Sequence, residues 1–262
     1  MGSTRMSKKR IVITGLGMVS PLGNTVADNW NNLLAGVSGI GPITRFDASN
    51  LACQIAGEVK DFDITQYIPA KEAHRMDVFI HYGIAAAFQA IEDAGLDNIE
   101  GLDKTRVGVN IGAGIGGLPS IEATGADVIA GGIRKINPFF IPGSLINLIA
   151  GHVTIMKGYQ GPSYGIVSAC TTGAHCIGDA ARMIAYGDAD IMIAGGAEGA
   201  ICTLGMGGFA AMKALSTRND EPQKACRPWD KERDGFVMGE GAGVMVLESY
   251  DSAIARGANI YA

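Results

Sequence analysis

The stretch that decides the fold is GPSYGIVSACTTGAHCIGDAARMIAYGDADIMIAGGAE, residues 161–198. Residues 164–169 have the composition of a strand, and the residues after them have the apolar spacing of a helix that ends near Gly187. Residues 191–198 form an apolar run, which predicts a second, buried strand. A strand, a helix and a strand in this order predict a crossover unit with parallel strands. The centre of the molecule is therefore expected to be a layered α/β sheet.

Similar patterns on both sides of this unit predict the rest of the sheet. Strands are expected at residues 11–14, 106–112 and 243–249. Helices are expected at residues 26–35, 76–95, 144–156 and 250–256. Residues 37–70 mix short apolar pieces with turn residues and are expected to be irregular. With no repeat or linker in the sequence, we expect one compact domain.

Composition excludes several classes of function. The chain has 262 residues, 47% of them hydrophobic, and a formal net charge of −5, so no overall basic field would attract nucleic acid. No apolar run is long enough to span a bilayer, and no secretory signal is visible, so membrane association is not expected. Five cysteines without a Cys-x-x-Cys pair favour a reducing compartment, that is, the cytoplasm. Residues 1–5, before Met6, are interpreted as a vector remnant, which leaves a domain at residues 6–262.

Three short motifs suggest other functions but lack the required context. GAGIGG, residues 112–117, matches a dinucleotide-binding loop, yet no acidic residue follows at the expected distance. GPSYG, around Ser163, matches the serine elbow of hydrolases but precedes the strand instead of following it. DKERDG, residues 230–235, begins like a calcium loop and has Gly241 where the bidentate glutamate belongs. The histidines and cysteines lack metal-ligand spacing, so we expect no metal site.

Cys170 stands where the predicted strand of residues 164–169 ends and the helix begins. A helix N-terminus has unpaired N–H groups and a positive dipole end, which together stabilise a thiolate and an oxyanion. Thr171, Thr172 and Gly173 keep the first turn small, leaving room for a carbonyl. This setting suits covalent acyl catalysis, although a small apolar residue closing a buried strand would fit the same position.

The other cysteines and the histidines lack this setting. Cys176 lies inside the predicted helix and is expected to pack in the core. Cys53, Cys202 and Cys226 show no pattern that points to chemistry. His152 and His175 lie in apolar helical stretches, where a buried histidine with a satisfied hydrogen bond is the default expectation.

Longer motifs, in the same order along the chain, resemble one enzyme family. They are IVITGLGMVSPLGN, GIGGL, NPFFIP, GPSYGIVSACTTGAHCIGDA, DADIMIAGGAE, GGFAAMKALSTRND and RPWDKERDGFVMGEGAGVMVLE. They cover nearly the whole chain after Met6, which resembles the type II β-ketoacyl-(acyl carrier protein) synthases, elongating condensing enzymes of the thiolase superfamily. The resemblance implies a thiolase-like fold, of which this chain would be the N-terminal αβα half with a mixed, mostly parallel sheet. It also implies a homodimer.

The same resemblance implies a function in fatty-acid elongation. Cys170 would take an acyl group as a thioester from acyl carrier protein. Malonyl-acyl carrier protein would then lose carbon dioxide, and its carbanion would attack the thioester to give a 3-oxoacyl product. No metal or organic cofactor is implied, because the 4′-phosphopantetheine arrives on the carrier protein substrate.

The resemblance also assigns roles to apolar and basic residues. Ile115, Leu118, Gly205 and Phe209 would line the acyl channel, while Phe140 and Ile141 would reach into the channel of the partner subunit. Ile115 favours type II over type I, in which that residue is usually smaller. The residues expected to bind the acidic carrier protein are Lys71, Arg75, Arg134, Lys135 and Lys213. His74 departs from the family pattern, since a basic residue is common there. Core packing and ordinary solvated charge are the alternative interpretations of these residues.

One departure from the family concerns the catalytic machinery. Its two catalytic histidines, its lysine and its glycine-rich phenylalanine loop match nothing in this sequence, so we expect a portion of a longer chain that accepts an acyl group without condensing it. A portion of this kind is also expected to expose apolar surface. A non-condensing partner that binds the carrier protein remains an alternative function, as does, more remotely, an NAD(P)-dependent dehydrogenase. Preferred acyl length is not predicted.

Overall fold

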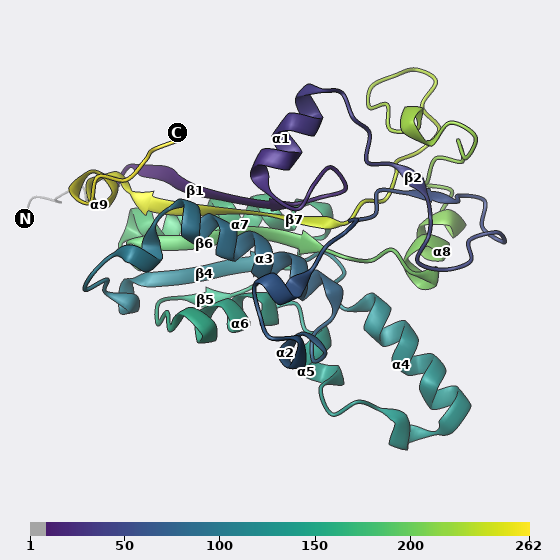
Figure 1. Cartoon of the computed structure of the whole chain (residues 1–262), viewed down its shortest axis with the longest axis horizontal. Helices are drawn as coiled ribbons and strands as arrows, with labels where there is room; N and C mark the ends of the chain where they lie inside the picture. Colours follow the sequence, from purple (N-terminus) through teal and green to yellow (C-terminus); the bar gives the residue numbers. More distant parts are fainter. Residues whose placement is uncertain (1–8) are drawn as a thin grey trace, which may run out of the picture.

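The computed structural model describes residues 9–262, so the interpretation of residues 1–5 as a vector remnant lies outside the described residues. A five-stranded sheet with the order β1–β7–β6–β4–β5 forms its centre (Figure 1). The strands are β1 (Ile11–Val19), β4 (Val107–Gly112), β5 (Ser163–Tyr164), β6 (Ile191–Glu198) and β7 (Gly241–Ser249). β4 pairs in parallel with β5 and β6, whereas β7 is antiparallel to both β6 and β1. The sheet is thus mixed around a parallel core, as expected.

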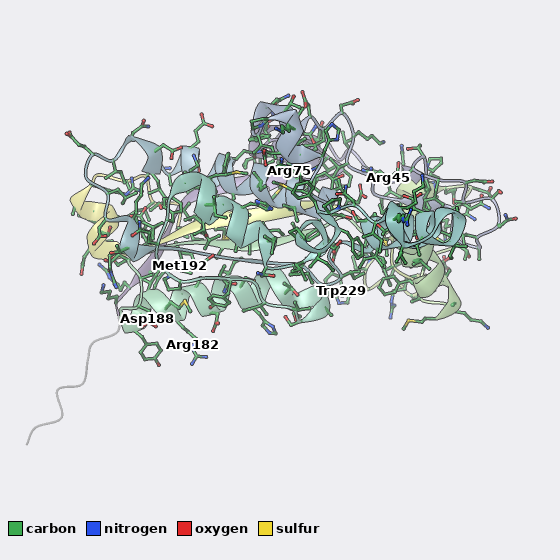
Figure 2. The ribbon with its side chains drawn as sticks, turned by 90° about the horizontal axis from the view of Figure 1, so that it is seen from below. Arg45, Arg75, Arg182, Asp188, Met192 and Trp229 are labelled. Atoms are coloured by element: carbon green, nitrogen blue, oxygen red, sulfur yellow. The ribbon has the colours of Figure 1, made fainter. Side chains whose placement is uncertain are left out.

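Helices cover both faces of this sheet and make three layers (Figures 1 and 2). α3 (Val78–Asp93) and α6 (Leu148–Lys157) lie on one face, and α7 (Thr172–Tyr186) lies on the other. Strand β6 shows how the two faces share one strand: Ile191 and Ile193 join the core under α3, whereas Met192 packs under α7. The αβα arrangement expected from the sequence is confirmed. The sheet with these three helices is called the body below.

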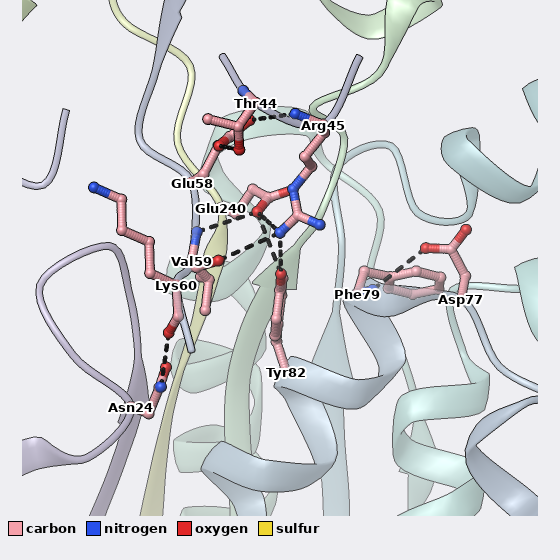
Figure 3. Close-up of polar contacts among 10 residues, drawn as sticks. All are labelled: Asn24, Thr44, Arg45, Glu58, Val59, Lys60, Asp77, Phe79, Tyr82 and Glu240. Atoms are coloured by element: carbon pink, nitrogen blue, oxygen red, sulfur yellow. Dashed lines mark hydrogen bonds and ion pairs between the residues drawn. The ribbon is translucent and has the colours of Figure 1, made fainter. Parts of the chain in front are cut away.

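Helix α3 is the most buried helix of the body, and its limits follow from its sequence. The Asp77 side chain accepts a hydrogen bond from the N–H of Phe79 and so caps the N-terminus (Figure 3). Gly95, at φ 67°, follows the C-terminus in the left-handed region, as the sequence predicts. Ala86 faces Gly17 of β1 so closely that a Cβ on Gly17 would lie 1.8 Å from the Ala86 carbonyl oxygen. Helix and strand therefore meet backbone to backbone.

That contact corrects the first predicted strand, which was expected to end at Gly15. β1 continues through Gly15 and Gly17 to Val19, because these glycines serve close packing against α3 rather than a turn. The strand predicted at residues 164–169 is wrong in the other direction, since regular pairing stops at Tyr164. β5 is an edge strand bonded only to β4, so nothing on its outer side holds residues 165–168 in a ladder.

A projecting region, called the arm below, comprises residues 118–145 (Figure 1). It contains α4 (Leu118–Gly131), the short helix η4 (Ile133–Lys135) and α5 (Phe140–Ser144). α4 and α5 were not predicted, and the helix expected at residues 144–156 corresponds to α6, which begins four residues later. The exposed apolar side chains of the arm are Ile121, Ile129, Ile133, Ile136, Phe139, Ile141 and Leu145.

Residues 37–70 are irregular, as expected. Ile55 and Ala56 pack with Met206 of α8 (Thr203–Ala211) in a small second core, whereas Val59 and Ile68 join the main core. Their short elements are β2 (Gly41–Pro42), β3 (Ile55–Ala56) and η1 (Ile64–Gln66), and α2 (Ala70–Ala73) follows. Arg45 anchors this segment, because its guanidinium lies 2.6 Å from Glu240 and donates a hydrogen bond to the Tyr82 hydroxyl (Figure 3). Burial raises the pKa of Glu240, and the Arg45 charge opposes that rise.

The remaining elements are not part of the body. They are α1 (Val26–Leu34), η2 (Leu96–Asn98), η3 (Lys104–Arg106), η5 (Ala169–Thr171), η6 (Pro222–Lys224) and α9 (Tyr250–Ala255). α1 and α9 agree with the helices predicted there. No helix within residues 9–262 combines the length and the apolar character needed to cross a membrane.

Candidate active site

Cys170 lies in a single helical turn, η5, which leads directly into α7. The preceding residue, Ala169, has φ 55°, a left-handed conformation that non-glycine residues rarely adopt. Two hydrogen bonds close the turn: the N–H of Ser168 donates to Thr172 Oγ1 at 2.9 Å, and Thr171 Oγ1 donates to the Ser168 carbonyl at 2.8 Å. Cys170 is exposed. The thiol thus stands accessible at a helix N-terminus, on a strained and tightly bonded turn.

His175, one turn further along α7, is exposed rather than buried as predicted. The buried residues of this helix are Thr172, Cys176, Ala180 and Ile184, which recur every four residues and leave His175 on the outer face. Its Nδ1 lies 2.7 Å from the hydroxyl of Ser168, so it supports the turn that holds Cys170. His152 is only partly buried, and that burial lowers its pKa. The prediction that both histidines belong to the core was therefore wrong.

A cavity of about 700 Å³ opens beside Cys170. The ends of β4, β6 and β7 line one part of this cavity. The apolar side chains of Ile115, Phe209 and Phe236 line another part. Phe209 and Phe236 are in edge-to-face contact with ring centroids 5.2 Å apart. The lining is mostly apolar, so the site offers one exposed thiol at the mouth of a space that suits a hydrocarbon chain.

Of the six residues predicted for the acyl channel, only Ile115 and Phe209 line this cavity together with Cys170. Leu118 begins α4 behind Ile115, and Gly205 lies in α8, where a Cβ would come 2.1 Å from the Ala200 carbonyl oxygen. Phe140 and Ile141 lie in α5 on the arm, and Phe140 borders a separate cavity of about 200 Å³. Their predicted role in a partner subunit stays a prediction.

Glu198 holds the glycine loop of residues 112–117 in place. Its carboxylate accepts hydrogen bonds from the N–H groups of Ile115 at 2.8 Å and Gly116 at 2.9 Å. Burial raises the pKa of Glu198, and these N–H groups oppose the rise. The loop donors that would hold a phosphate are therefore engaged by a carboxylate, which argues against dinucleotide binding.

The serine-hydrolase and metal alternatives also lack structural support. Ser163 lies in β5, ahead of the turn, and its hydroxyl lies 2.9 Å from that of Thr154. Within residues 9–262, no group of three His, Cys, Asp or Glu side chains is placed to bind a metal ion. Burial raises the pKa of Cys176 and that of Cys202, the latter to about 11, which leaves both thiols protonated at neutral pH.

Four of the five basic residues predicted to bind a carrier protein lie around the base and tip of the arm. Lys71 is in α2, Arg75 follows it, and Arg134 and Lys135 share η4. Arg75 pairs with Glu72 at 2.9 Å, stacks on the Phe139 ring and borders the same small cavity as Lys135. Lys213 lies apart, beyond the end of α8, with φ 54°.

Two carboxylates were missed by sequence reasoning: Glu198, which lines the cavity, and Glu122 of α4, which binds the start of α8. Each binds backbone N–H groups more than 80 residues away in the chain, so no local pattern reveals the contact. A weak signal was available for Glu198, because a charged residue that ends an apolar strand needs a partner. The Ser168–His175 contact was also missed, although both residues flank Cys170.

Comparisons with known proteins agree with this architecture. The family model described as Beta-ketoacyl synthase, N-terminal domain, matches residues 8–253. The chain is 60% identical over 257 residues to a 3-oxoacyl-[acyl-carrier-protein] synthase 2 of Vibrio harveyi, covering 98% of this chain and 62% of that protein. The corresponding protein of Coxiella burnetii is 58% identical over 257 residues, with the same two coverages. The chain therefore spans about 62% of the length of these curated relatives.

Comparison with solved structures also finds ketosynthases. A β-ketoacyl synthase from Burkholderia phymatum STM815 superposes with a TM-score of 0.87 at 33% identity, over 96% of this chain and 62% of that one. A type II PKS acyl-carrier protein in complex with its ketosynthase, bound to the hexaketide, provides a second match, with a TM-score of 0.82 and 31% identity over 97% of this chain and 61% of that one. The thiolase-like fold inferred from the sequence is confirmed. The chain belongs to the β-ketoacyl synthase family, of which it carries the N-terminal domain.

Proposed function

We propose that this chain forms the acyl-accepting half of a 3-oxoacyl-(acyl carrier protein) synthase of fatty-acid elongation. The observation that carries the proposal is the exposed Cys170 thiol at the N-terminus of α7, beside an apolar cavity of about 700 Å³. The Cys170 thiolate attacks the carbonyl of an acyl thioester, and the pantetheine thiol of the carrier protein leaves with a proton. The acyl chain then lies along Ile115 and Phe209.

The second half of the reaction belongs to the protein that carries both halves of the fold. Decarboxylation of malonyl-acyl carrier protein and attack of its carbanion on the Cys170 thioester require the family's histidines, and the histidines of this chain do not correspond to them. Transfer of the acyl group itself needs only a nucleophile and donors for the oxyanion, so no metal or organic cofactor is proposed.

The acidic carrier protein is the proposed partner, bound by the basic residues near the arm. Support comes from the structural relative whose ketosynthase is in complex with an acyl-carrier protein, and from the local positive charge of Arg134 and Lys135 on a chain of net charge −5. A homodimer is proposed as well, since the exposed apolar residues of the arm would be buried between two copies. Cytoplasmic localisation remains an expectation.

Peptide mass spectrometry after mixing the chain with a medium-length acyl-acyl carrier protein tests the proposal. We expect the acyl mass on the peptide that contains Cys170, its release by hydroxylamine, and its absence in Cys170→Ala. A folded chain that stays unmodified would contradict the acyl-accepting function. Binding of the carrier protein without modification of Cys170 would favour a non-condensing carrier-binding partner instead.

A further inference from the structure

Helix α8, which carries Phe209, has a sequence with a low intrinsic tendency to form a helix. Its sequence, TLGMGGFAA, contains three glycines, each of which disfavours a helix. Its N-cap residue, Cys202, makes no side-chain capping bond. Gly207 and Gly208 have no neighbour within 4 Å of where a Cβ would be, so packing does not explain them. The position of this helix must therefore depend on contacts from outside it.

Glu122 of α4 supplies such a contact. One carboxylate oxygen accepts a hydrogen bond from the N–H of Leu204 at 2.6 Å, and the other accepts one from the N–H of Thr203 at 3.3 Å. Partial burial opposes ionisation of Glu122, but hydrogen bonds from Leu204, Cys202 and Thr203 outweigh it and lower the pKa of the carboxyl. A carboxylate from one helix thus caps the N-terminus of another, where the unpaired N–H groups and the dipole favour a negative charge.

Each of the two helices joined in this way is connected to a residue that lines the cavity. Ile115 lies just before α4 begins, and Phe209 lies in α8. The hydrogen bonds of Glu122 therefore limit how far Phe209 can move relative to Ile115.

We propose that Glu122 is a positioning residue that sets the length of the chain accepted beside Cys170, by holding α8 at a fixed distance from α4. The inference rests on the proposed function, because it takes the cavity to be the acyl site. It assigns no contact with the reacting atoms to Glu122, which acts through α8 and Phe209.

Alkylation of Cys170 by iodoacetamides with straight N-alkyl chains tests the proposal without a carrier protein. The thiolate displaces iodide and forms a thioether, so the rate reports how well each chain fits the cavity. With chains of roughly four to sixteen carbons, each methylene that enters the cavity should raise the rate by up to about fourfold, until the cavity is full. Cys226, which is exposed, provides an internal reference on the same molecule.

In Glu122→Gln, one acceptor becomes an amide donor that faces a backbone N–H, so α8 is released. We expect the chain length of fastest alkylation to shift by two or more methylenes, which changes the rate ratio between long and short probes by about tenfold. Glu221→Gln, which alters an exposed carboxylate paired with Lys224, should keep the wild-type profile. If Glu122→Gln does not fold, Glu122→Asp, shorter by one methylene, should also move the optimum.

Two results would overturn the inference. The first is a rate for wild-type Cys170 that does not depend on chain length, and the second is an unchanged optimum in Glu122→Gln whose Leu204 amide exchanges hydrogen faster than in the wild type. A merely structural role would lower all rates together and leave the ratio between probes unchanged. A shifted optimum in a chain that takes no acyl group from carrier protein would support the inference and reject the proposed function, so the two failures can be told apart.

Discussion

Helices α3 and α4 are of similar length but have opposite relations to the rest of the molecule. Ten of the sixteen residues of α3 are buried by contacts with the sheet and with the neighbouring helix α6, whereas α4 has no buried residue. The apolar side chains of α3 are buried by contacts within the described part of the chain, whereas those of the arm are exposed. Cys170 stands on the body, and the basic residues proposed to meet a carrier protein cluster mainly around the arm. The body is therefore a packed unit that carries Cys170, and the exposed residues of the arm suit the proposed contacts between molecules.

The largest effect is expected in the body. Phe79 is fully buried in α3, so Phe79→Ala should lower the free energy of unfolding by about 3–5 kcal/mol. Urea unfolding followed by circular dichroism measures the loss. A loss below about 1 kcal/mol would mean that α3 does not hold the body together, because burial of its apolar face would then contribute little.

A smaller effect is expected at the loop that joins the body to the arm. In Glu198→Gln, one of the two backbone N–H groups at Ile115 and Gly116 loses its acceptor, which should cost about 1–3 kcal/mol. Acylation of Cys170 should slow as well, because Ile115 loses its fixed position. An unchanged acylation rate in this variant would show that the glycine loop does not shape the cavity.

The difference in stability between the wild type and Glu198→Gln should also depend on pH. The pKa of Glu198 is raised by burial above its ordinary value of 4.5, so the folded chain binds a proton more tightly than the unfolded chain. Its contribution to stability is therefore fully present below pH 4.5 and is lost as the pH rises through the raised value. The free energy of unfolding of the wild type minus that of Glu198→Gln, measured between pH 4 and 8, should fall as the pH rises. A difference that rises with pH would contradict this prediction.

Charge reversal on the arm should affect transfer from the carrier protein but not the thiol itself. For the double variant Arg134→Glu, Lys135→Glu, acylation by acyl-acyl carrier protein should slow by about tenfold at low salt, because rim charges govern association rates. Acylation by a small acyl thioester without a carrier should stay at the wild-type rate. Equal slowing on both routes would mean that the change disturbs the cavity instead of a docking surface.

The smallest effect on stability is expected at the tip of the arm. Ile129 is 90% exposed, so Ile129→Ser should change the free energy of unfolding by no more than about 0.5 kcal/mol. Analytical ultracentrifugation of the same variant should show weaker self-association, since the arm is the proposed dimer surface. A clearly destabilised monomer would place Ile129 in a core.

The contrast between body and arm also explains what the sequence could predict. α3, α7 and β6 were recognised because their apolar residues face the core at regular spacing, and Gly95 and Gly187 mark the ends of the two helices. α4 was missed because its apolar residues have no core to face. The length of β5 was overestimated, because the β-forming residues Ile166 and Val167 lie at an unsupported edge.

At the site, the junction that holds Cys170 was predictable, because a helix start can be read from local sequence. The contacts of Glu122 and Glu198 were not, since each joins residues far apart in the chain through backbone N–H groups that exist at every position. Sequence resemblance placed Ile115 and Phe209 in one channel, and the structure brings both to the cavity beside Cys170. For Leu118, Gly205, Phe140 and Ile141, the channel role stays a prediction.

A crystal structure of the protein after Cys170 has reacted with N-dodecyl iodoacetamide tests the proposed acyl site most directly. In the thioether, the amide carbonyl lies one carbon further from the sulfur than a thioester carbonyl would, and the alkyl chain beyond it reports the path of an acyl group. We expect this alkyl chain to run into the cavity lined by Ile115 and Phe209. An alkyl chain that lies outside, with the cavity closed or filled by side chains, would contradict the claim that Cys170 and this cavity form an acyl-accepting site.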